Sequence, residues 1–338
     1  FGVAGVGVRG RCRAPGAVGA GWFLGSGGHL PRAGGGDVAA TWSRSSGSRE
    51  QGPSMSEGRA FSVKADGLTY AGLEWGDPDG YPILALHGWL DNALSFSVIA
   101  PFLSEYRLIA LDLSGQGLSD HRSPDATYHI WDDVPQLLSV VATLELDQLT
   151  VLGHSRGAAI AVLLATALED RCSQLVLLDG MLPRPAPDES AVEHFLQSQR
   201  DHRGLPKHQP RTFKDIEGFV RARVPLGFSE SSAKLLAPRA LKETEDGWAL
   251  AHDPRLNHAS AVKLSPGMCS AFYSAMTKPT LALVAEEGLR VRGGLEASLA
   301  AVSEIANCRV VTVPGSHHTH MEEGAQRIAE HIAAFIDW

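Results

Sequence analysis

Short, continuously apolar segments recur from about residue 59 onward, and most of them end in a polar or glycine-containing loop. Runs of this length without alternation are typical of parallel β-strands that are buried on both faces. The first two segments instead flank an Asp66-Gly67 turn and are expected to pair with each other. The predicted strands cover 60–64, 68–75, 82–86, 107–111, 149–152, 174–178, 279–284 and 309–313.

Segments with the spacing of an amphipathic helix lie between these apolar runs. Helices are predicted over 131–146, 158–168, 295–305 and 325–336. Alternating strands and helices indicate the α/β class, with a mostly parallel central sheet that is flanked by helices. Ligands bind beyond the carboxyl ends of the strands in such sheets, so functional residues are expected in the loops that follow strands.

The alternation stops between Pro183 and Lys278, in a stretch that is rich in Arg, His, Glu and Pro. Amphipathic helices are predicted here over 190–200, 212–223 and 231–243. Because this stretch interrupts two sheet strands, we expect an inserted helical cap, at about 183–278, that lies over the strand ends.

The first 54 residues have a different composition from the rest. They hold 15 of the chain's 36 glycines, and six arginines against two acidic residues give them a net charge of +4. A segment with no hydrophobic period cannot bury enough apolar surface to offset its ordering entropy. We expect residues 1–54 to be a disordered or non-native leader, from upstream translation or a transit-like peptide. The folded domain is then 55–338, beginning at Met55.

Charge and cysteine usage exclude several functions. The 338 residues carry a net charge of −8, which argues against nucleic acid as a partner. No apolar run reaches the 18–20 residues that a membrane-spanning helix needs. Four scattered cysteines fit a reducing compartment. We therefore expect an intracellular, cytoplasmic protein, with organelle import the alternative if the leader is a transit peptide. The oligomeric state stays open.

A candidate nucleophile lies in the G-x-S-x-G sequence 153–157, between a predicted strand and a predicted helix. A sharp strand-to-helix turn needs small residues two positions before and after the serine, and Gly153 and Gly157 stand there. The turn is expected to hold the hydroxyl of Ser155 at the start of the helix, where backbone N–H groups favour developing negative charge.

A hydroxyl nucleophile needs a base, and His317 lies in the loop after the last predicted strand. His318 and His320 are alternatives for that base, and at strand-like spacing they could instead bind a metal. No carboxylate or cysteine follows them at ligand spacing, so we expect neither a metal nor a cofactor.

The acid that orients the base is left open by the residues. Asp179 ends the strand after the nucleophile helix, and Glu286 and Glu287 follow the strand 279–284. Both strand ends can border one cleft, so each of these side chains is a candidate.

An oxyanion hole needs two backbone N–H donors. One is expected from Arg156, directly after the serine. The other is expected from Trp89 in the turn 87–89, where Gly88 lets the chain turn tightly past a strand end. The glycine-rich loop 111–120 lacks a phosphate-binding continuation and is interpreted as a structural turn.

With these residues in hand, the chain resembles the α/β-hydrolase superfamily, and within it the serine hydrolase-like proteins. The motifs that carry the resemblance are 87–92, 112–119, 153–157 and 313–321, in the family's order. The resemblance implies an α/β-hydrolase fold, a nucleophile at Ser155 and a base at His317 rather than at His318 or His320.

One departure from the family pattern concerns the acid. Many members carry an Asp at the end of a turn after the penultimate strand, where this chain has Gly288. Some relatives place the acid one strand earlier, at the position of Asp179. The resemblance therefore favours Asp179, with Glu286 or Glu287 as the alternative.

The predicted function is a serine hydrolase that cleaves a carboxylic ester or thioester of a small molecule through an acyl-enzyme. The missing acid at Gly288 motivates a second hypothesis, a ligand-binding or signalling protein on this fold with little turnover.

Overall fold

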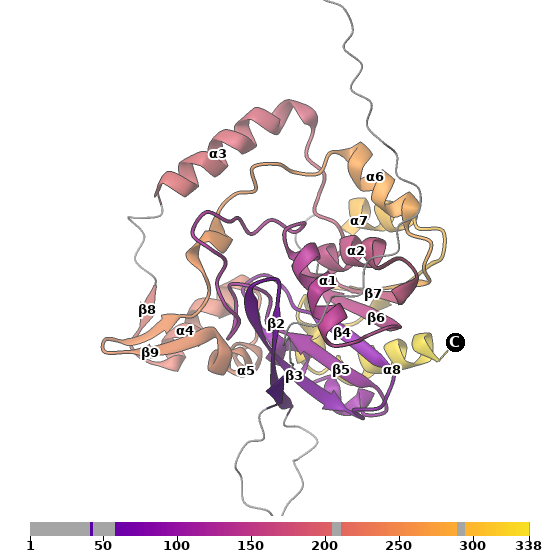
Figure 1. Cartoon of the computed structure of the whole chain (residues 1–338), viewed down its shortest axis with the longest axis horizontal. Helices are drawn as coiled ribbons and strands as arrows, with labels where there is room; N and C mark the ends of the chain where they lie inside the picture. The colour runs from indigo at the N-terminus through magenta and orange to yellow at the C-terminus, as the bar shows by residue number, and fades with distance from the viewer. Residues whose placement is uncertain (1–40, 43–57, 205–210, 289–294, 338) are drawn as a thin grey trace, which may run out of the picture. The chain divides into compact units, whose positions relative to one another are not determined.

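The computed structural model describes residues 41–42, 58–204, 211–288 and 295–337 (Figure 1). Of the predicted leader 1–54, only Thr41–Trp42 falls within these residues. It forms strand β1 and pairs antiparallel with strand β2, Arg59–Ala65. These two residues, which the sequence pattern placed outside the fold, thus pair with the sheet. The rest of the leader, and Met55, lie outside the described residues.

A nine-stranded sheet forms the centre of the described part of the chain, in the order β1-β2-β3-β5-β4-β6-β7-β11-β12. All neighbours from β5 to β12 run parallel, whereas the pairs among β1, β2, β3 and β5 are antiparallel. The mostly parallel sheet is therefore confirmed. The further strands are β3 Leu68–Gly76, β4 Pro82–Leu86, β5 Arg107–Leu111, β6 Leu149–His154, β7 Cys172–Leu178, β11 Thr280–Ala285 and β12 Cys308–Val313.

The central strands are apolar on both sides because helices cover both faces of the sheet. Within β4, Leu84 and Leu86 belong to one hydrophobic cluster, and Ile83 and Ala85 belong to the other. All six residues of β6 and of β11 are buried. A strand in this position has no polar face, which is why a continuous apolar run identifies it in the sequence.

Five of the described α-helices pack on the two faces of the sheet. The cluster on one face draws on α1, α2, α6 and α7, and the cluster on the other draws on α8 and two short 3-10 helices, Ala93–Phe96 and Ala100–Leu103. The helices are α1 Asp133–Thr143, α2 Arg156–Leu168, α6 Pro266–Ala275, α7 Leu295–Val302 and α8 Ala325–Ile336. Helix α6 was not predicted, although Ser265 caps it and Pro266 is its first residue, which is a helix-start signal.

Residues 179–279 connect the neighbouring strands β7 and β11, and we call them the insert. The insert holds α3, α4 and α5 together with a small antiparallel sheet in the order β8-β10-β9 (Figure 1). Its elements before α6 are α3 Ala191–Gly204, β8 Thr212–Phe213, α4 Ile216–Arg223, α5 Glu230–Ala240, β9 Leu241–Thr244 and β10 Gly247–Leu250.

The purely helical prediction for the insert is therefore wrong in part. The predicted helix 212–223 begins only at Ile216, because the side chain of Asp215 accepts a hydrogen bond from the N–H of Gly218 and caps the helix there. The predicted helix 231–243 ends at Ala240, and the chain continues as β9. The two-residue loop Glu245–Asp246 then leads into β10, whose first residue, Gly247, pairs with Thr244.

Two buried ion pairs join the insert to loops of the main sheet. Arg239 on α5 contacts the carboxylate of Asp112 at 2.8 Å, and Arg223 on α4 contacts that of Asp91 at 3.0 Å. Asp112 also accepts hydrogen bonds from the N–H groups of Ala93 and Leu118. Each carboxylate is buried, so the insert supplies the cations that make the burial of these charges tolerable.

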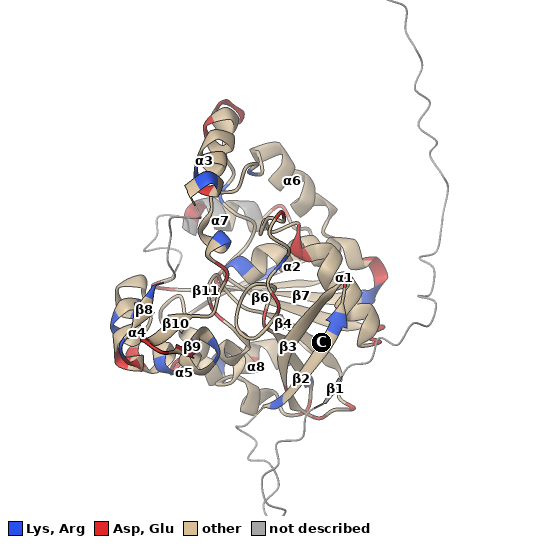
Figure 2. Cartoon of the chain, turned by 60° about the vertical axis from the view of Figure 1, so that its left-hand side comes forward, with Lys and Arg blue, Asp and Glu red and all other residues tan. Residues whose placement is uncertain are grey.

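Charged side chains avoid the centre of the sheet. In Figure 2, strands β4, β6 and β7 carry no charged residue, whereas Lys, Arg, Asp and Glu gather on helices and loops. None of the described helices combines the length and the apolar character that crossing a membrane requires.

We expect that Arg239→Met lowers the free energy of unfolding by about 3 kcal/mol, because it leaves the buried carboxylate of Asp112 without its cation. Urea unfolding followed by circular dichroism measures the change. The matched control is Arg221→Met, which removes an exposed ion pair with Asp215 and should change stability by no more than about 0.5 kcal/mol. Equal effects of the two substitutions would contradict the anchoring role of Arg239.

Candidate active site

Ser155 lies at a strained turn between strand β6 and helix α2. Its φ of 53° and ψ of −117° are sparsely populated by residues other than glycine. A Cβ at Gly157 would lie 2.0 Å from the carbonyl oxygen of Leu86, and one at Gly153 would lie 2.5 Å from the Cα of Ala158. A side chain at either position would overlap the backbone, so glycine at both positions allows the tight turn.

The imidazole of His317 lies beside this serine. His317 is in the loop after strand β12, and its Nε2 accepts a hydrogen bond from the Oγ of Ser155 at 2.9 Å. Along the chain the two residues are 162 positions apart. They meet because β6 and β12 run in the same direction and present their carboxyl ends at the same edge of the sheet.

The carboxylate of Asp179 contacts the other side of the same imidazole. Asp179 directly follows strand β7, and its Oδ2 accepts a hydrogen bond from the Nδ1–H of His317 at 2.5 Å. Its Oδ1 accepts from the N–H of Ala285 at 2.9 Å, and the side chain is buried. Both carboxylate oxygens therefore have hydrogen-bond donors, which offset the cost of burying this polar group.

Gly288 explains why a carboxylate can come from the earlier strand. A Cβ at Gly288 would lie 2.1 Å from Oδ2 of Asp179 and 2.6 Å from its carbon Cγ. The space that a side chain at position 288 would need is thus filled by the carboxylate of Asp179. Glu286 and Glu287 are both exposed to solvent, and neither is hydrogen-bonded to His317.

The two predicted oxyanion donors lie at the ends of different elements. Arg156 is the first residue of α2, where backbone N–H groups have no acceptor within the helix. Trp89 lies in the turn after β4. The buried ring of His87 stabilises this turn through two hydrogen bonds. The Nδ1–H of His87 donates to the carbonyl of Gly88 at 2.8 Å, and its Nε2 accepts from the N–H of Leu113 at 3.0 Å.

The side chain of Arg156 is fixed by other partners. Its Nη2 donates to Asp133 at 2.9 Å and to the carbonyl of Tyr128 at 3.0 Å. The guanidinium is thus neutralised by a buried carboxylate, so the residue offers its backbone rather than its charge to the site.

Three further histidines crowd around His317. The ring centroid of His154 lies 4.8 Å from that of His317, 5.5 Å from that of His318 and 4.2 Å from that of His320. Burial lowers the pKa of His154 well below its ordinary value, and it lowers the pKa of His320 to about 3. These two rings are therefore neutral imidazoles at neutral pH.

The described residues contain one group of His, Cys, Asp or Glu side chains whose donor atoms converge as metal ligands do. It consists of Asp91, His154 and His318, with donor atoms within 4.8 Å of one another. His320, the partner that the i, i+2 spacing suggested for His318, is not in this group. Its Nε2 instead faces the Oγ of Ser95 at 3.4 Å.

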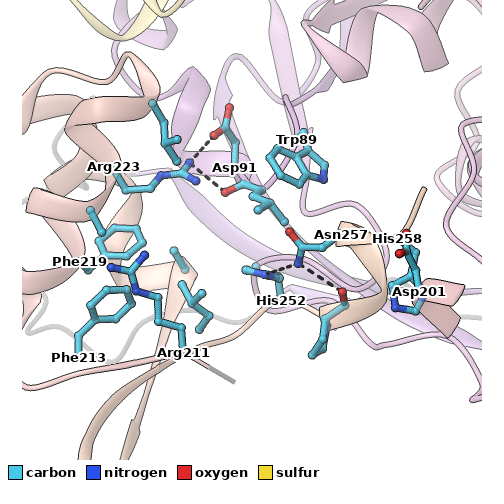
Figure 3. Close-up of a pocket in the computed structure, with 17 residues that line it drawn as sticks. Trp89, Asp91, Asp201, Arg211, Phe213, Phe219, Arg223, His252, Asn257 and His258 are labelled. Atoms are coloured by element: carbon cyan, nitrogen blue, oxygen red, sulfur yellow. Dashed lines mark hydrogen bonds and ion pairs between the residues drawn. The ribbon is translucent and has the colours of Figure 1, made fainter. Parts of the chain in front are cut away.

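A cavity of about 510 Å³ lies beside the turn that contains Trp89 (Figure 3). Most of its lining comes from the insert, including Arg211, Phe213 and Phe219, and the rest comes from loops of the main sheet. Ser155 and His317 are not among the lining residues. Within the proposed site, the cavity borders the turn that contains Trp89 and Asp91.

Comparison with known proteins agrees with this geometry. A family model described as alpha/beta hydrolase fold matches residues 81–323. The chain belongs to the α/β-hydrolase fold family. The motif-based resemblance and the predicted fold class are both confirmed.

Within this α/β-hydrolase family, the chain is similar to serine hydrolase-like proteins. The human serine hydrolase-like protein 2 is 30% identical over 287 residues, which cover 79% of this chain and 90% of that protein. A serine hydrolase-like protein of Dictyostelium discoideum is 28% identical over 284 residues, 79% of each chain. Among solved structures, a hypothetical protein from Pseudomonas aeruginosa is 34% identical, with a TM-score of 0.78, and the match covers 82% of this chain and 99% of that one.

Sequence reasoning missed two residues of this α/β-hydrolase site, Asp91 and Arg223. Their ion pair joins positions 132 residues apart, and no local spacing indicates such a partner. It also missed that His154, inside the G-x-S-x-G motif, donates through Nε2 to the carbonyl of His317 at 3.0 Å. The one sequence signal for this contact is that His154 is a polar residue at the end of an otherwise apolar strand.

We expect that Gly288→Ala separates Asp179 from His317, because the added methyl group overlaps the carboxylate. The measurement is the downfield proton resonance of the His317 Nδ1–H, which a short hydrogen bond to a carboxylate produces and which should be lost or shifted upfield. The matched control is Gly267→Ala on helix α6, where a Cβ would meet nothing closer than 4.0 Å. An unchanged resonance in Gly288→Ala would show that the carboxylate accommodates the methyl group.

Proposed function

We propose that this α/β-hydrolase is a serine hydrolase that cleaves a carboxylic ester or thioester through an acyl-enzyme. The observation that carries the proposal is the continuous line of hydrogen bonds from Ser155 through His317 to Asp179, at 2.9 and 2.5 Å. A nucleophile, a base and an orienting carboxylate in this order are the parts that acyl transfer requires.

In the first half of the reaction, Nε2 of His317 takes the proton from the hydroxyl of Ser155 as Oγ attacks the carbonyl carbon of the substrate. The N–H groups of Trp89 and Arg156 donate hydrogen bonds to the oxyanion that forms. His317 then gives its proton to the leaving alcohol or thiol, and the acyl group stays on Ser155. In the second half, water replaces the leaving group, and the same steps release the acid.

Asp179 acts through His317 rather than on the substrate. Its hydrogen bond keeps the proton of the neutral imidazole on Nδ1, so that Nε2 carries the lone pair that faces Ser155. When His317 accepts the proton of the serine, the buried carboxylate stabilises the resulting positive charge. The amide of Ala285 holds the carboxylate in place during both steps.

The cavity beside Trp89 supports a role of the insert as a cap that selects substrates. We propose that residues 183–278 act in this way, because they supply most of the lining of that cavity. The cavity is lined by the apolar rings of Phe213 and Phe219 and by the cation of Arg211. The rings suit an acyl chain, and the cation suits a polar or anionic group at its end.

The alternative of a ligand-binding protein with little turnover loses its main support. It rested on the lack of an acid at Gly288, and the hydrogen bond between Asp179 and His317 supplies a carboxylate from the preceding strand. We therefore favour hydrolysis.

A fluorophosphonate probe, which reacts with activated serine hydroxyls, is expected to label the native chain at a single residue. Substitution Ser155→Ala should abolish this labelling, because it removes the nucleophile while the fold is retained. Gel fluorescence and mass spectrometry of the labelled peptide measure the result. Labelling that persists in Ser155→Ala would show that Ser155 is not the reactive nucleophile.

Substitution Asp179→Asn is expected to lower kcat for an activated ester by roughly 10⁴-fold, because an amide in this position no longer favours the Nδ1–H form of His317. Two matched controls remove the other candidate acids: Glu286→Gln and Glu287→Gln should leave kcat within about twofold, since both side chains are exposed. Ester hydrolysis across a panel of acyl lengths measures both effects. If kcat falls more in either control than in Asp179→Asn, the orienting acid is the glutamate after β11 and not Asp179.

A further inference from the structure

Two hydrogen-bond acceptors face each other inside the protein, next to the line of Ser155, His317 and Asp179. His154 donates its Nε2–H to the carbonyl of His317 at 3.0 Å, so its Nδ1 carries a lone pair. This Nδ1 is completely buried and has no hydrogen-bond partner. It lies 3.7 Å from Oδ2 of Asp91. A carboxylate oxygen and a nitrogen lone pair that face each other in a buried place repel each other unless a proton or a metal ion lies between them.

A third donor completes the group. His318 is buried as well, and one of its ring nitrogens lies within 4.8 Å of the donor atoms of both Asp91 and His154. Its ring is held by stacking on Phe228 of the insert, with ring centroids 3.7 Å apart. The three donors come from the loop after β4, the last residue of β6 and the loop after β12.

We propose that Asp91, His154 and His318 bind a divalent transition-metal ion, and that Zn²⁺ is the ion that fits this donor set best. Two imidazoles and one carboxylate are common ligands of zinc, and with three protein ligands the fourth position is left to water. In a tetrahedral site with bonds of about 2 Å, donor atoms lie about 3.3 Å apart. The pair Asp91–His154, at 3.7 Å, needs to close by a few tenths of an ångström. The donor atom of His318 lies within 4.8 Å of the other two, so its ring needs to approach them by up to about 1.5 Å when an ion binds.

The surroundings of this site match what metal ligands require. The two partners that orient the ligands are already present. The carbonyl of His317 holds His154. The guanidinium of Arg223 holds Oδ1 of Asp91 at 3.0 Å, as Figure 3 shows. Oδ2 of Asp91 is left to face the site.

Space is also present beside the proposed ligands. A Cβ at Gly88 would lie 2.8 Å from Oδ2 of Asp91 and 3.0 Å from Nδ1 of His154, so the absence of a side chain there leaves room beside both donors. Asp91 also lines the cavity of about 510 Å³, which brings open space to one of the three proposed ligands.

Each ligand is close in sequence to a residue of the proposed active site. His154 precedes Ser155, His318 follows His317, and Asp91 is two residues beyond Trp89. A bound ion would therefore tie together the nucleophile turn, the loop of the base and the oxyanion turn. We expect it to raise the thermal unfolding temperature of the chain, because it binds the folded state and not the unfolded one.

The test is metal binding by the full chain after treatment with a chelator. Isothermal titration with Zn²⁺ should give one ion per chain, and Co²⁺ should produce the visible absorption bands of a four-coordinate site. Asp91→Asn and His318→Phe should each weaken Zn²⁺ binding by roughly 100-fold or more. These two variants keep the shape of the side chain, and His318→Phe also keeps the ring that stacks on Phe228.

The matched control is His320→Gln, which removes a buried histidine of the same cluster that is not a proposed ligand, and it should bind Zn²⁺ as the native chain does. Circular dichroism of the metal-free variants checks that they fold. The proposal is overturned if the native chain takes up no Zn²⁺ at one equivalent, or if Asp91→Asn and His318→Phe bind as tightly as the native chain. No substrate is used, so the result is independent of the proposed hydrolase activity.

Discussion

The carboxylate of Asp179 is the group on which the arrangement of the site depends. It is buried, and it accepts hydrogen bonds from the imidazole of His317 and from the backbone of Ala285. A buried carboxylate without such donors would be costly, so these contacts hold the loops after β7, β11 and β12 in one mutual position. Gly288 belongs to the same constraint, because any larger residue there would displace the carboxylate.

A second layer of buried charge connects the insert to this framework. Arg239 and Arg223 reach from α5 and α4 to Asp112 and Asp91, each within 3.0 Å. Breaking either pair would leave an isolated charge in the interior, so separating α4 and α5 from the loops of the main sheet has a large free-energy cost. The same Asp91 faces His154, which places the anchoring of the insert beside the proposed metal ligands.

The strands of the main sheet and the elbow around Ser155 could be predicted because the sequence marks them locally. A strand covered on both faces is apolar at most positions, and the elbow needs glycine at Gly153 and Gly157. The insert was harder to predict, since α4, α5 and the small sheet pack into a separate small hydrophobic cluster, and no residue of α3 is buried. There the helical spacing of apolar residues extended into Thr212–Phe213 and Leu241–Thr244, which pair as strands.

The sequence by itself determined the class of the fold, the turn that holds Ser155 and the set of candidate acids. Those features depend on residues that are close along the chain, through turn geometry and hydrophobic periodicity. Only the tertiary structure decided that Asp179, rather than Glu286 or Glu287, contacts His317, and that Asp91, His154 and His318 converge. These contacts join residues more than 60 positions apart, and their geometry is set by how parallel strands bring their ends together.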